Sequence, residues 1–264
     1  MKKPKLLICD LDGTLLNETG QIDAASLAEI KAFCLAGGEL VICTGRLDQD
    51  IEFVEKALGF KGAFRISQNG AVITKRDGEI LQALPIAADL IEPINQVVFE
   101  SGLRVEISST QNRYFPSPRN PEDVAEFVDT SIVVEDLEAA SRSQFEPVIY
   151  LMFGSREKFA EIKAKLPLGE SSPIQAIMTS EQSLEIFSKE VSKGIAAKAV
   201  MDQMGLTSEQ VVIFGDAESD TTMFPLTEYS FAVQKASQEV RRQASHYAAT
   251  VGEALRFLKE KELI

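Results

Sequence analysis

An apolar run ends on two carboxylates near the start of the chain. Residues 5–9, KLLIC, lead directly into Asp10, and Asp12 follows two residues later in the stretch DLDGT. A continuous apolar run of this length is typical of a strand that is buried on both faces of a parallel sheet. Because open parallel sheets bind ligands beyond the carboxyl ends of their strands, Asp10 and Asp12 are candidates for a binding or catalytic site.

Two further apolar runs end on polar residues. Residues 39–43, ELVIC, lead into Thr44, and residues 210–215, QVVIFG, lead into Asp216. If these strands are neighbours, Asp10, Thr44 and Asp216 gather at one edge of the sheet, where the carboxylates repel one another. Mg²⁺ relieves such repulsion, because it accepts one or two carboxylates together with water and phosphate oxygens. Turn formation and helix capping are the alternative explanation for acids at these places.

Other common catalytic motifs are missing from the sequence. It contains neither the phosphate loop G-x-x-x-x-G-K-[ST] nor the dinucleotide fingerprint G-x-G-x-x-G. A catalytic triad would depend on His246, the one histidine of the chain, which has no nucleophile motif beside it. We therefore expect His246 to be a structural or surface residue.

Composition argues against several classes of partner. The net charge is −13 and no cluster of Lys and Arg interrupts it, so we expect no nucleic-acid partner. No run approaches the ~20 apolar residues of a membrane span, so we expect no membrane partner. Cys9, Cys34 and Cys43 are odd in number and lack the spacing of a metal site. We therefore expect free thiols in a reducing, cytoplasmic environment. We also expect a monomer or a small homo-oligomer.

Alternating strands and helices at both ends of the chain must position these residues. After the strand at 5–9, the pattern predicts a small hairpin at 14–22, a helix at 24–36 capped by Asp23, and a helix that ends near 58–59. Near the other end it predicts a helix at 193–205 capped by Ser192, the strand at 210–215 and a closing helix at 251–263. Strands that alternate with helices imply a parallel sheet.

The middle of the chain has a different pattern, which predicts an inserted α+β domain. Adjacent strand doublets favour an antiparallel sheet with helices on one face. The expected strands are 103–108, 130–135, 147–154, 174–179 and 183–188, and the expected helices are 87–101, 121–128 and 156–166. We expect a core domain from residues 1–83 and 191–264 and an inserted domain from residues 84–190.

Four motifs in order resemble the haloacid dehalogenase superfamily of phosphotransferases. They are DLDGTLL, VICTGR, VSKG and FGDAESD, and the inserted segment is similar to the large cap of the Cof-like branch. SQNGAVI at 67–73 resembles the Asn-Gly segment that precedes this cap. The resemblance implies a Rossmann-like α/β core with an inserted α+β cap, and a Mg²⁺-dependent phosphatase. The implied substrate is a small phosphorylated metabolite, with a sugar phosphate as the expected example.

The resemblance also implies a role for each acid. Asp10 would be the nucleophile that forms an aspartyl-phosphate. Asp12 would be the general acid and then the base that activates water. Mg²⁺ would bind Asp10, Asp216 and the backbone carbonyl of Asp12, and Asp220 would orient Lys193 or the metal-bound water. Glu218 would lie further from the metal.

The remaining implied residues bind phosphate or substrate, and they are Leu11, Thr44, Gly45 (at a helix N-terminus), Asn69, Lys193 and Ser219. Lys193 would neutralise developing charge. A surface lysine is the alternative, but the helix dipole disfavours a cation in a first helical turn, which supports the functional role. The Cof-like pattern usually has Asn where this chain has Ser219. Losing a transition-state donor costs ~2–4 kcal/mol where nothing replaces it. Asn69 is equally well explained as a turn residue.

Two alternative functions stay open at this point. A phosphomutase of the same fold would pass the phosphoryl group to a sugar instead of water. A non-catalytic metabolite-binding protein would keep the fold and the metal without turnover, and Ser219 is the feature that favours it.

In the inserted domain, Arg113, Tyr114 and Arg119 are candidate polar contacts for a substrate, or belong to an ordinary solvated loop.

Overall fold

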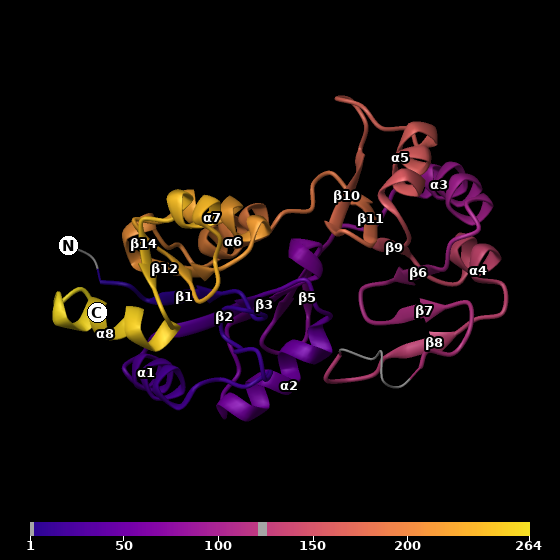
Figure 1. The fold of residues 1–264 in the computed structure, drawn as a ribbon. Helices are drawn as coiled ribbons and strands as arrows, with labels where there is room; N and C mark the ends of the chain where they lie inside the picture. The colour runs from indigo at the N-terminus through magenta and orange to yellow at the C-terminus, as the bar shows by residue number, and fades with distance from the viewer. Residues whose placement is uncertain (1–2, 121–125) are drawn as a thin grey trace. The chain divides into compact units, whose positions relative to one another are not determined.

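The computed structural model describes residues 3–120 and 126–264 and divides into two compact units. The first unit contains Met1–Gln82 and Ser192–Ile264, and the second contains Ala83–Val191. Both ends of the chain therefore build the first unit, and the second is inserted between them (Figure 1). These boundaries lie within one residue of those expected from the sequence.

An eight-stranded sheet forms the centre of the first unit. β1 (Leu6–Cys9) lies in the middle and pairs in parallel with β12 (Val211–Gly215) and with β2 (Glu39–Cys43). β3 (Phe64–Ser67) pairs in parallel with β2, whereas β4 (Val72–Lys75) is antiparallel to β3. The remaining strands are β5 (Ile80–Ala83), β13 (Tyr229–Val233) and β14 (His246–Ala248), and the sheet order is β14-β13-β12-β1-β2-β3-β4-β5.

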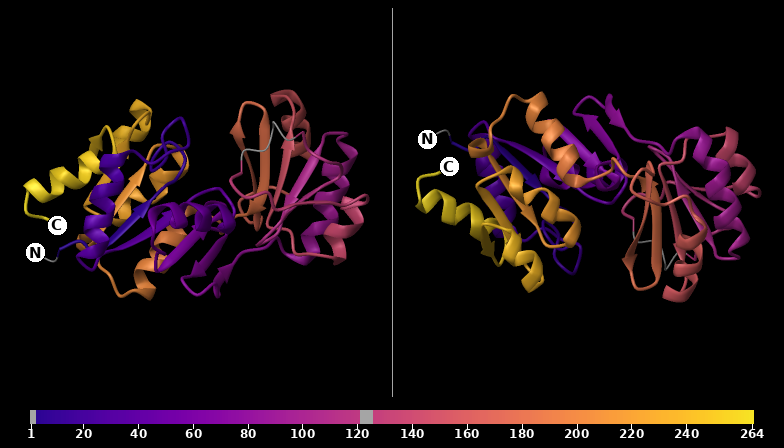
Figure 2. Two further views of the ribbon diagram at one scale, coloured as in Figure 1. Left: turned by 90° about the horizontal axis from the view of Figure 1, so that it is seen from below. Right: turned by 90° about the horizontal axis from the view of Figure 1, so that it is seen from above.

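Helices cover both faces of this sheet (Figures 1 and 2). One face is covered by α6 (Lys193–Gln203) and α7 (Gln238–Gln243). The other is covered by α1 (Ala24–Leu35), α2 (Asp48–Leu58) and α8 (Val251–Glu260). Short 3-10 helices complete the unit, namely η1 (Gln68–Gly70), η3 (Ser208–Gln210), η4 (Glu218–Thr222) and η5 (Phe224–Leu226). The predicted α/β class is confirmed.

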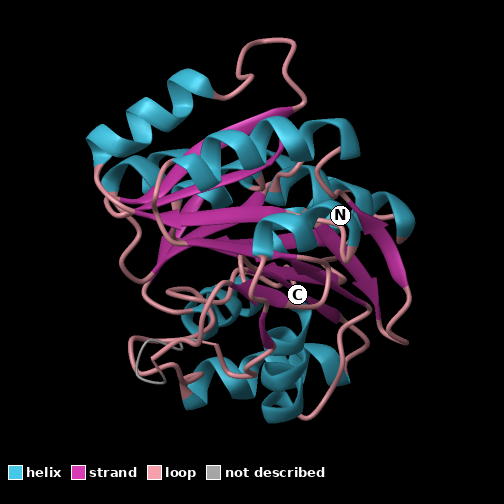
Figure 3. Cartoon of the chain, turned by 90° about the vertical axis from the view of Figure 1, so that its right-hand side faces the viewer, coloured by secondary structure: helices cyan, strands magenta, loops and turns pink. Residues whose placement is uncertain are grey.

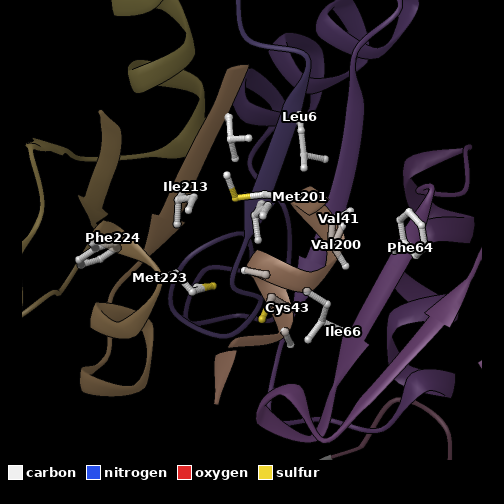
Figure 4. Close-up of a cluster of buried hydrophobic side chains, with 14 of the residues drawn as sticks. Leu6, Val41, Cys43, Phe64, Ile66, Val200, Met201, Ile213, Met223 and Phe224 are labelled. Atoms are coloured by element: carbon white, nitrogen blue, oxygen red, sulfur yellow. The ribbon is translucent and has the colours of Figure 1, made fainter. Parts of the chain in front are cut away.

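The core under α6 fixes the three strands that precede Asp10, Thr44 and Asp216. Figure 4 shows side chains of Leu6, Val41 and Ile213 near Val200 and Met201 of α6, and all five belong to one buried cluster. Fully burying one such side chain contributes roughly 1.5–3 kcal/mol, so this cluster holds the strands in register against the helix.

Two local predictions in this unit are wrong. No strand forms in residues 14–22, where an isolated bridge joins Asp12 and Leu16. The Asn17 side chain instead accepts the backbone N–H groups of Thr19 and Gln21, which closes a turn in place of a ladder. Ser192 takes the N-cap position of α6 but its side chain makes no capping hydrogen bond. Asp23, in contrast, caps α1 as predicted.

The second unit has its own six-stranded sheet, in the order β10-β11-β9-β6-β7-β8. Among the described residues its strands pair antiparallel, except that β7 and β8 are parallel. The strands are β10 (Ile174–Ser180), β11 (Ser183–Ser188), β9 (Ile149–Phe153), β6 (Val105–Ser108), β7 (Arg113–Phe115) and β8 (Ser131–Val133).

Three helices pack on one face of this second sheet, and the sequence predicts helices on one face only, though not all of these three. They are α3 (Ala88–Glu100), α4 (Leu137–Ser143) and α5 (Arg156–Lys165), and Figure 3 distinguishes helices from strands by colour. The strand β7 and the helix α4 were not predicted. Residues 121–125 of the predicted helix 121–128 lie outside the described residues, and residues 126–128 are not helical. Across the described ranges, every helix is too short or too polar to cross a membrane.

Arg65 of β3 forms a buried ion cluster with α2. Its side chain is 1% exposed, and its guanidinium donates to both carboxylate oxygens of Asp48 at 2.8 and 2.9 Å. Glu52 and Glu55 lie 3.4 and 3.5 Å from the same guanidinium. Removing one member of a buried ionic group leaves uncompensated charge, which is strongly destabilising.

We expect Arg65→Met to lower the free energy of unfolding by about 3–5 kcal/mol, measured by urea denaturation followed by circular dichroism. Arg76→Ala is the matched control, because its ion pair with Glu39 is half-exposed and such pairs contribute about 1 kcal/mol or less. Equal losses in the two variants would contradict a stabilising role for the buried cluster.

Candidate active site

Polar residues follow neighbouring parallel strands at one edge of the first sheet. Asp10 follows β1, Thr44 follows β2 and Asp216 follows β12. Sheet hydrogen bonds continue into the first two of these residues, since Asp10 N–H donates to Phe214 O at 3.1 Å and Thr44 N–H donates to Ile66 O at 2.9 Å. Asp10 and Thr44 are therefore held by the sheet itself, and all three residues lie at the edge where parallel sheets bind ligands.

Lys193 joins two of the buried acids. Its Nζ donates to Asp10 Oδ1 at 2.6 Å and to Asp220 Oδ1 at 2.8 Å. Lys193 and Asp10 are each 4% exposed, and Asp220 is fully buried. Burial opposes the charge on Lys193, but Asp10 and Asp220 outweigh it and hold the pKa of Lys193 above its ordinary value. The lysine is therefore a buried, charged group of the site and not a surface residue.

Asp220 accepts hydrogen bonds from Lys193 and from the backbone of the turn after β12. While one oxygen accepts from Lys193, Asp220 Oδ2 accepts the backbone N–H groups of Asp216 and Ala217 at 3.0 and 2.9 Å. Asp220 therefore orients Lys193 and also shapes the turn that presents Asp216. Gly215 makes this possible, because a Cβ there would lie 2.3 Å from the Asp220 Cβ.

The acids provide a set of ligands that fits a divalent cation. Oxygen atoms of Asp10, Asp216 and Asp220 all lie within 4.8 Å of one another. Burial raises the pKa of Asp10 to about 8, despite the opposing charge of Lys193, and burial also raises the pKa of Asp216. A bound hard cation would offset this crowded negative charge. Because both oxygens of Asp220 are already engaged, Asp10 and Asp216 are the residues that could hold it.

Asp216 is itself held by the loop after β1. Thr14 Oγ1 donates to Asp216 Oδ1 at 2.6 Å, and the Thr14 side chain is buried. Gly13 adopts a φ of +81°, and a Cβ at this position would lie 2.4 Å from Asp216 Oδ2. The glycine is required both by its left-handed backbone and by this close approach.

Asp12 points into a different environment. Its carboxylate accepts two hydrogen bonds from Arg46, from Nε at 2.7 Å and from Nη2 at 2.8 Å. Arg46 also contacts the buried Asp50 at 3.2 Å. With 53% of its side chain exposed, Asp12 is far more accessible than Asp10. The two aspartates of DLDGT therefore lie in different environments, one buried beside Lys193 and one exposed beside Arg46.

Thr44, Gly45 and Asn69 lie together in the loops after β2 and β3. Asn69 N–H donates to Thr44 O at 2.9 Å, and a Cβ on Gly45 would lie 3.2 Å from Asn69 Oδ1. Asn69 has a φ of +58°, so it is a turn residue that also borders the site. The expectation that Gly45 lies at a helix N-terminus is wrong, because α2 begins three residues later at Asp48.

Other predicted positions are placed less directly. The Leu11 side chain is fully buried, so its backbone is the part available to a ligand. Ser219 and Glu218 are exposed on η4, where Ser219 O accepts from Thr222 Oγ1 at 2.9 Å. His246 is half-buried and packs against the rings of Phe231 and Phe257, as expected for a structural residue. Cys9 and Cys43 are buried free thiols, and Cys34 is a half-buried one.

In the second unit the structure brings together two of the three predicted polar residues. Arg113 and Arg119 both contact the Glu126 carboxylate, at 2.6 and 2.9 Å. They line a cavity of about 530 Å³ with Arg104, Glu106 and Phe153, among others. Tyr114 instead stacks on Phe145, with ring centroids 3.7 Å apart, and packs against the core under the helices. It is therefore a packing residue.

Sequence reasoning assigned no role to three residues that support the site. Thr14 and Arg46 belong to the quoted stretches DLDGT and TGR, so their place in a motif was an available signal. Gln234, which follows β13 and donates to the backbone of Thr14 at 2.8 Å, had no such signal.

Comparisons with known proteins find relatives that match nearly the whole chain. The family model of haloacid dehalogenase-like hydrolases matches residues 7–254. The phosphatase YwpJ of Bacillus subtilis is 25% identical over 280 residues, which cover 93% of this chain and 95% of that protein. A haloacid dehalogenase-like hydrolase from Bacteroides thetaiotaomicron has the same fold, with a TM-score of 0.86, 19% identity, and coverage of 97% of this chain and 100% of that one. A subclass IIB sugar phosphatase superposes with a TM-score of 0.77 and 18% identity, covering 98% and 100% of the two chains.

Proposed function

The chain belongs to the haloacid dehalogenase-like hydrolase family, and from this premise we propose that it is a Mg²⁺-dependent phosphatase that hydrolyses a small phosphorylated metabolite. One observation carries the proposal. Asp10 lies buried at the end of β1, where its Oδ1 is 2.6 Å from Lys193 Nζ and where Asp216 and Asp220 are close by. Buried charged groups that cluster in this way are typical of a catalytic site. The named phosphatases among its relatives support the same reaction class.

Asp10 is the proposed nucleophile. One of its carboxylate oxygens attacks phosphorus, the bond from phosphorus to the ester oxygen breaks, and an aspartyl-phosphate forms. Water then attacks this phosphorus, the bond to Asp10 breaks, and inorganic phosphate leaves. Covalent catalysis divides one difficult displacement into two easier ones. The strand end and the sheet hydrogen bond from Asp10 N–H to Phe214 O fix the position of this carboxylate.

Asp12 is the proposed acid and base. It gives a proton to the departing ester oxygen in the first step and takes one from the attacking water in the second. Its exposure suits this exchange, because the leaving group and water both reach it from solvent. Arg46 sets the direction of the Asp12 carboxylate through its two parallel hydrogen bonds.

Three proposed groups would stabilise the negative charge of the phosphoryl group: an ammonium, a pair of hydrogen-bond donors and a metal ion. The ammonium of Lys193 faces Asp10 and offsets charge that develops during transfer. The Thr44 hydroxyl and the backbone N–H of Gly45 are suitable donors to phosphate oxygens. Asp10, Asp216 and the backbone carbonyl of Asp12 would hold Mg²⁺, which when bound shields the repulsion between a carboxylate and an anionic phosphate.

The substrate is proposed from the site and from the second unit. The second unit would act as a cap that governs which phosphate ester is accepted. A sugar phosphate is the proposed example, because a cavity lined by three arginines and two carboxylates offers hydrogen bonds to hydroxyl groups.

The test is phosphate release from a panel of sugar phosphates, nucleotides and phosphorylated acids, with and without Mg²⁺. We expect metal-dependent release from at least one member and none from the Asp10→Asn variant. If no member is hydrolysed although the folded protein binds Mg²⁺, the phosphatase proposal fails for these substrates, and transfer to added sugar acceptors becomes the next assay.

The proposed role of Asp12 has a specific signature in the leaving group. We expect Asp12→Asn to slow hydrolysis of an alkyl phosphate by roughly 10²- to 10⁴-fold, the usual contribution of general acid–base catalysis. Hydrolysis of p-nitrophenyl phosphate should suffer less, because its leaving oxygen departs without a proton. The measurement is kcat/KM for both esters in both proteins. An equal loss for the two esters would rule out proton donation by Asp12.

A further inference from the structure

Gln234 connects a neighbouring strand to the loop that carries the acids. It follows β13, and its side-chain Nε2 donates to Thr14 O at 2.8 Å and to Leu16 O at 3.4 Å. These bonds link positions more than 200 residues apart in the chain. They fix the backbone of the loop after β1 at Thr14, and the side chain of Thr14 donates to Asp216.

The backbone of Gln234 is held in an unfavourable conformation. Its φ is +48°, a left-handed value that glycine adopts at no steric cost and other residues adopt rarely. Two contacts maintain it, since Gln234 O accepts from Tyr247 Oη at 3.1 Å and from Arg241 Nη2 at 3.2 Å. Strained residues of this kind persist when the surroundings determine them, and they concentrate at functional sites.

Thr14 transmits this position to Asp216. Its hydroxyl donates to Asp216 Oδ1 at 2.6 Å from a side chain that is 1% exposed. Gly13 lies against the other oxygen of the same carboxylate. The loop at 13–14 therefore contacts both oxygens of the Asp216 carboxylate, and Gln234 bonds to the backbone of this loop.

We propose that Gln234 and Thr14 are positioning residues that orient Asp216 for metal binding. This inference rests on the proposed function, because Asp216 is a metal ligand only if the site binds Mg²⁺. Partners that orient the ligands of a metal typically change its affinity by about 10- to 100-fold when they are removed. Gln234 acts one step further from the metal than Thr14, so its effect should be the smaller of the two.

Substitution by glycine separates this role from a merely structural one. Gln234→Gly removes the side-chain amide but relieves the left-handed strain, so it should not lower the free energy of unfolding. Gln234→Asn tolerates the same backbone but is one methylene shorter, and it cannot span the distance to Thr14 O. Thr14→Val removes the hydroxyl with little change of shape, whereas Thr14→Ser retains it.

The experiment measures Mg²⁺ affinity by calorimetric titration and stability by urea denaturation without metal. We expect Thr14→Val to bind Mg²⁺ about 10- to 100-fold more weakly, and Gln234→Gly about tenfold more weakly with an unchanged or higher urea midpoint. Thr14→Ser should remain close to the original protein. Weaker Mg²⁺ binding lowers activity mainly when Mg²⁺ is limiting. The turnover rate of Gln234→Gly should therefore approach that of the original protein at saturating Mg²⁺ and fall below it at limiting Mg²⁺.

Two results would overturn the inference and one would overturn its premise. Equal Mg²⁺ affinity in the original protein, Thr14→Val and Gln234→Gly would show that the two residues do not orient Asp216. If the Mg²⁺ affinity of the variants falls only where their urea midpoint falls as well, Thr14 and Gln234 have a structural role and do not position Asp216. If the original protein itself fails to bind Mg²⁺, the proposed metal dependence is wrong, and the inference fails with it.

Discussion

Asp10→Asn should lose roughly 10⁴- to 10⁶-fold in kcat and still fold, the size of effect seen when a covalent nucleophile is removed. The amide keeps the shape of the side chain but cannot form the aspartyl-phosphate. Stability should not fall in the absence of metal, because Asp10 is a buried carboxylate near Asp216 and Asp220 whose pKa burial raises to about 8. Neutralising it removes repulsion, and Lys193 keeps Asp220 as a partner.

The measurement combines single-turnover phosphate release with urea denaturation, both with and without Mg²⁺. Asp12→Asn is the matched control, because its side chain is half-exposed and it would not form the covalent intermediate. Acid-quenched protein should carry phosphate in the control and none in Asp10→Asn. Labelled phosphate on the Asp10→Asn protein, or turnover within tenfold of the original, would place the nucleophile elsewhere.

Lys193→Met should impair both activity and folding. It removes a charge that faces the reacting group, which we expect to lower kcat by roughly 10²- to 10³-fold. It also leaves Asp10 and Asp220 buried without their cation, and we expect the free energy of unfolding to fall by about 3–5 kcal/mol. The loss of stability should be measured by urea denaturation without metal and should shrink when Mg²⁺ is added, because the cation offsets the same carboxylates.

A double variant separates these two effects. Lys193→Met combined with Asp220→Asn removes one carboxylate together with the ammonium, so much of the stability should return. Activity should not return, because the charge that faces the phosphoryl group is still missing. If the double variant is as unstable as Lys193→Met alone, the buried pair is not the source of the loss. Recovery of activity with stability would assign Lys193 a purely structural role.

Much of the site could be predicted because its residues are tied to local sequence. Asp10, Thr44 and Asp216 each directly follow a short apolar run, and the structure places each one directly after a strand. The parallel order of β1, β2 and β12 then brings them to one edge. Asp23 could be predicted as a helix cap for the same reason, since it bonds three residues ahead in the chain.

Local competition explains where such prediction was wrong. In residues 14–22 the Thr19-Gly20 pair predicts the turn of a hairpin, but the Asn17 side chain accepts two nearby N–H groups and closes a turn without strands. Tyr114 and Arg113 are adjacent in sequence, yet strand alternation turns them to opposite faces of the second sheet, one to the helices and one to the cavity.

The sequence by itself determined the residue types at the strand ends, the alternation that builds a parallel sheet, and the order of four motifs. Which groups touch was decided only by the tertiary structure. Lys193 meets Asp10 across 183 residues, and Thr14 meets Asp216 across 202. Pattern along the chain reports which face or end a side chain occupies, because strand and helix periods are local. Contacts between distant segments depend on the sheet order and on close packing, and these exist only once the chain has folded.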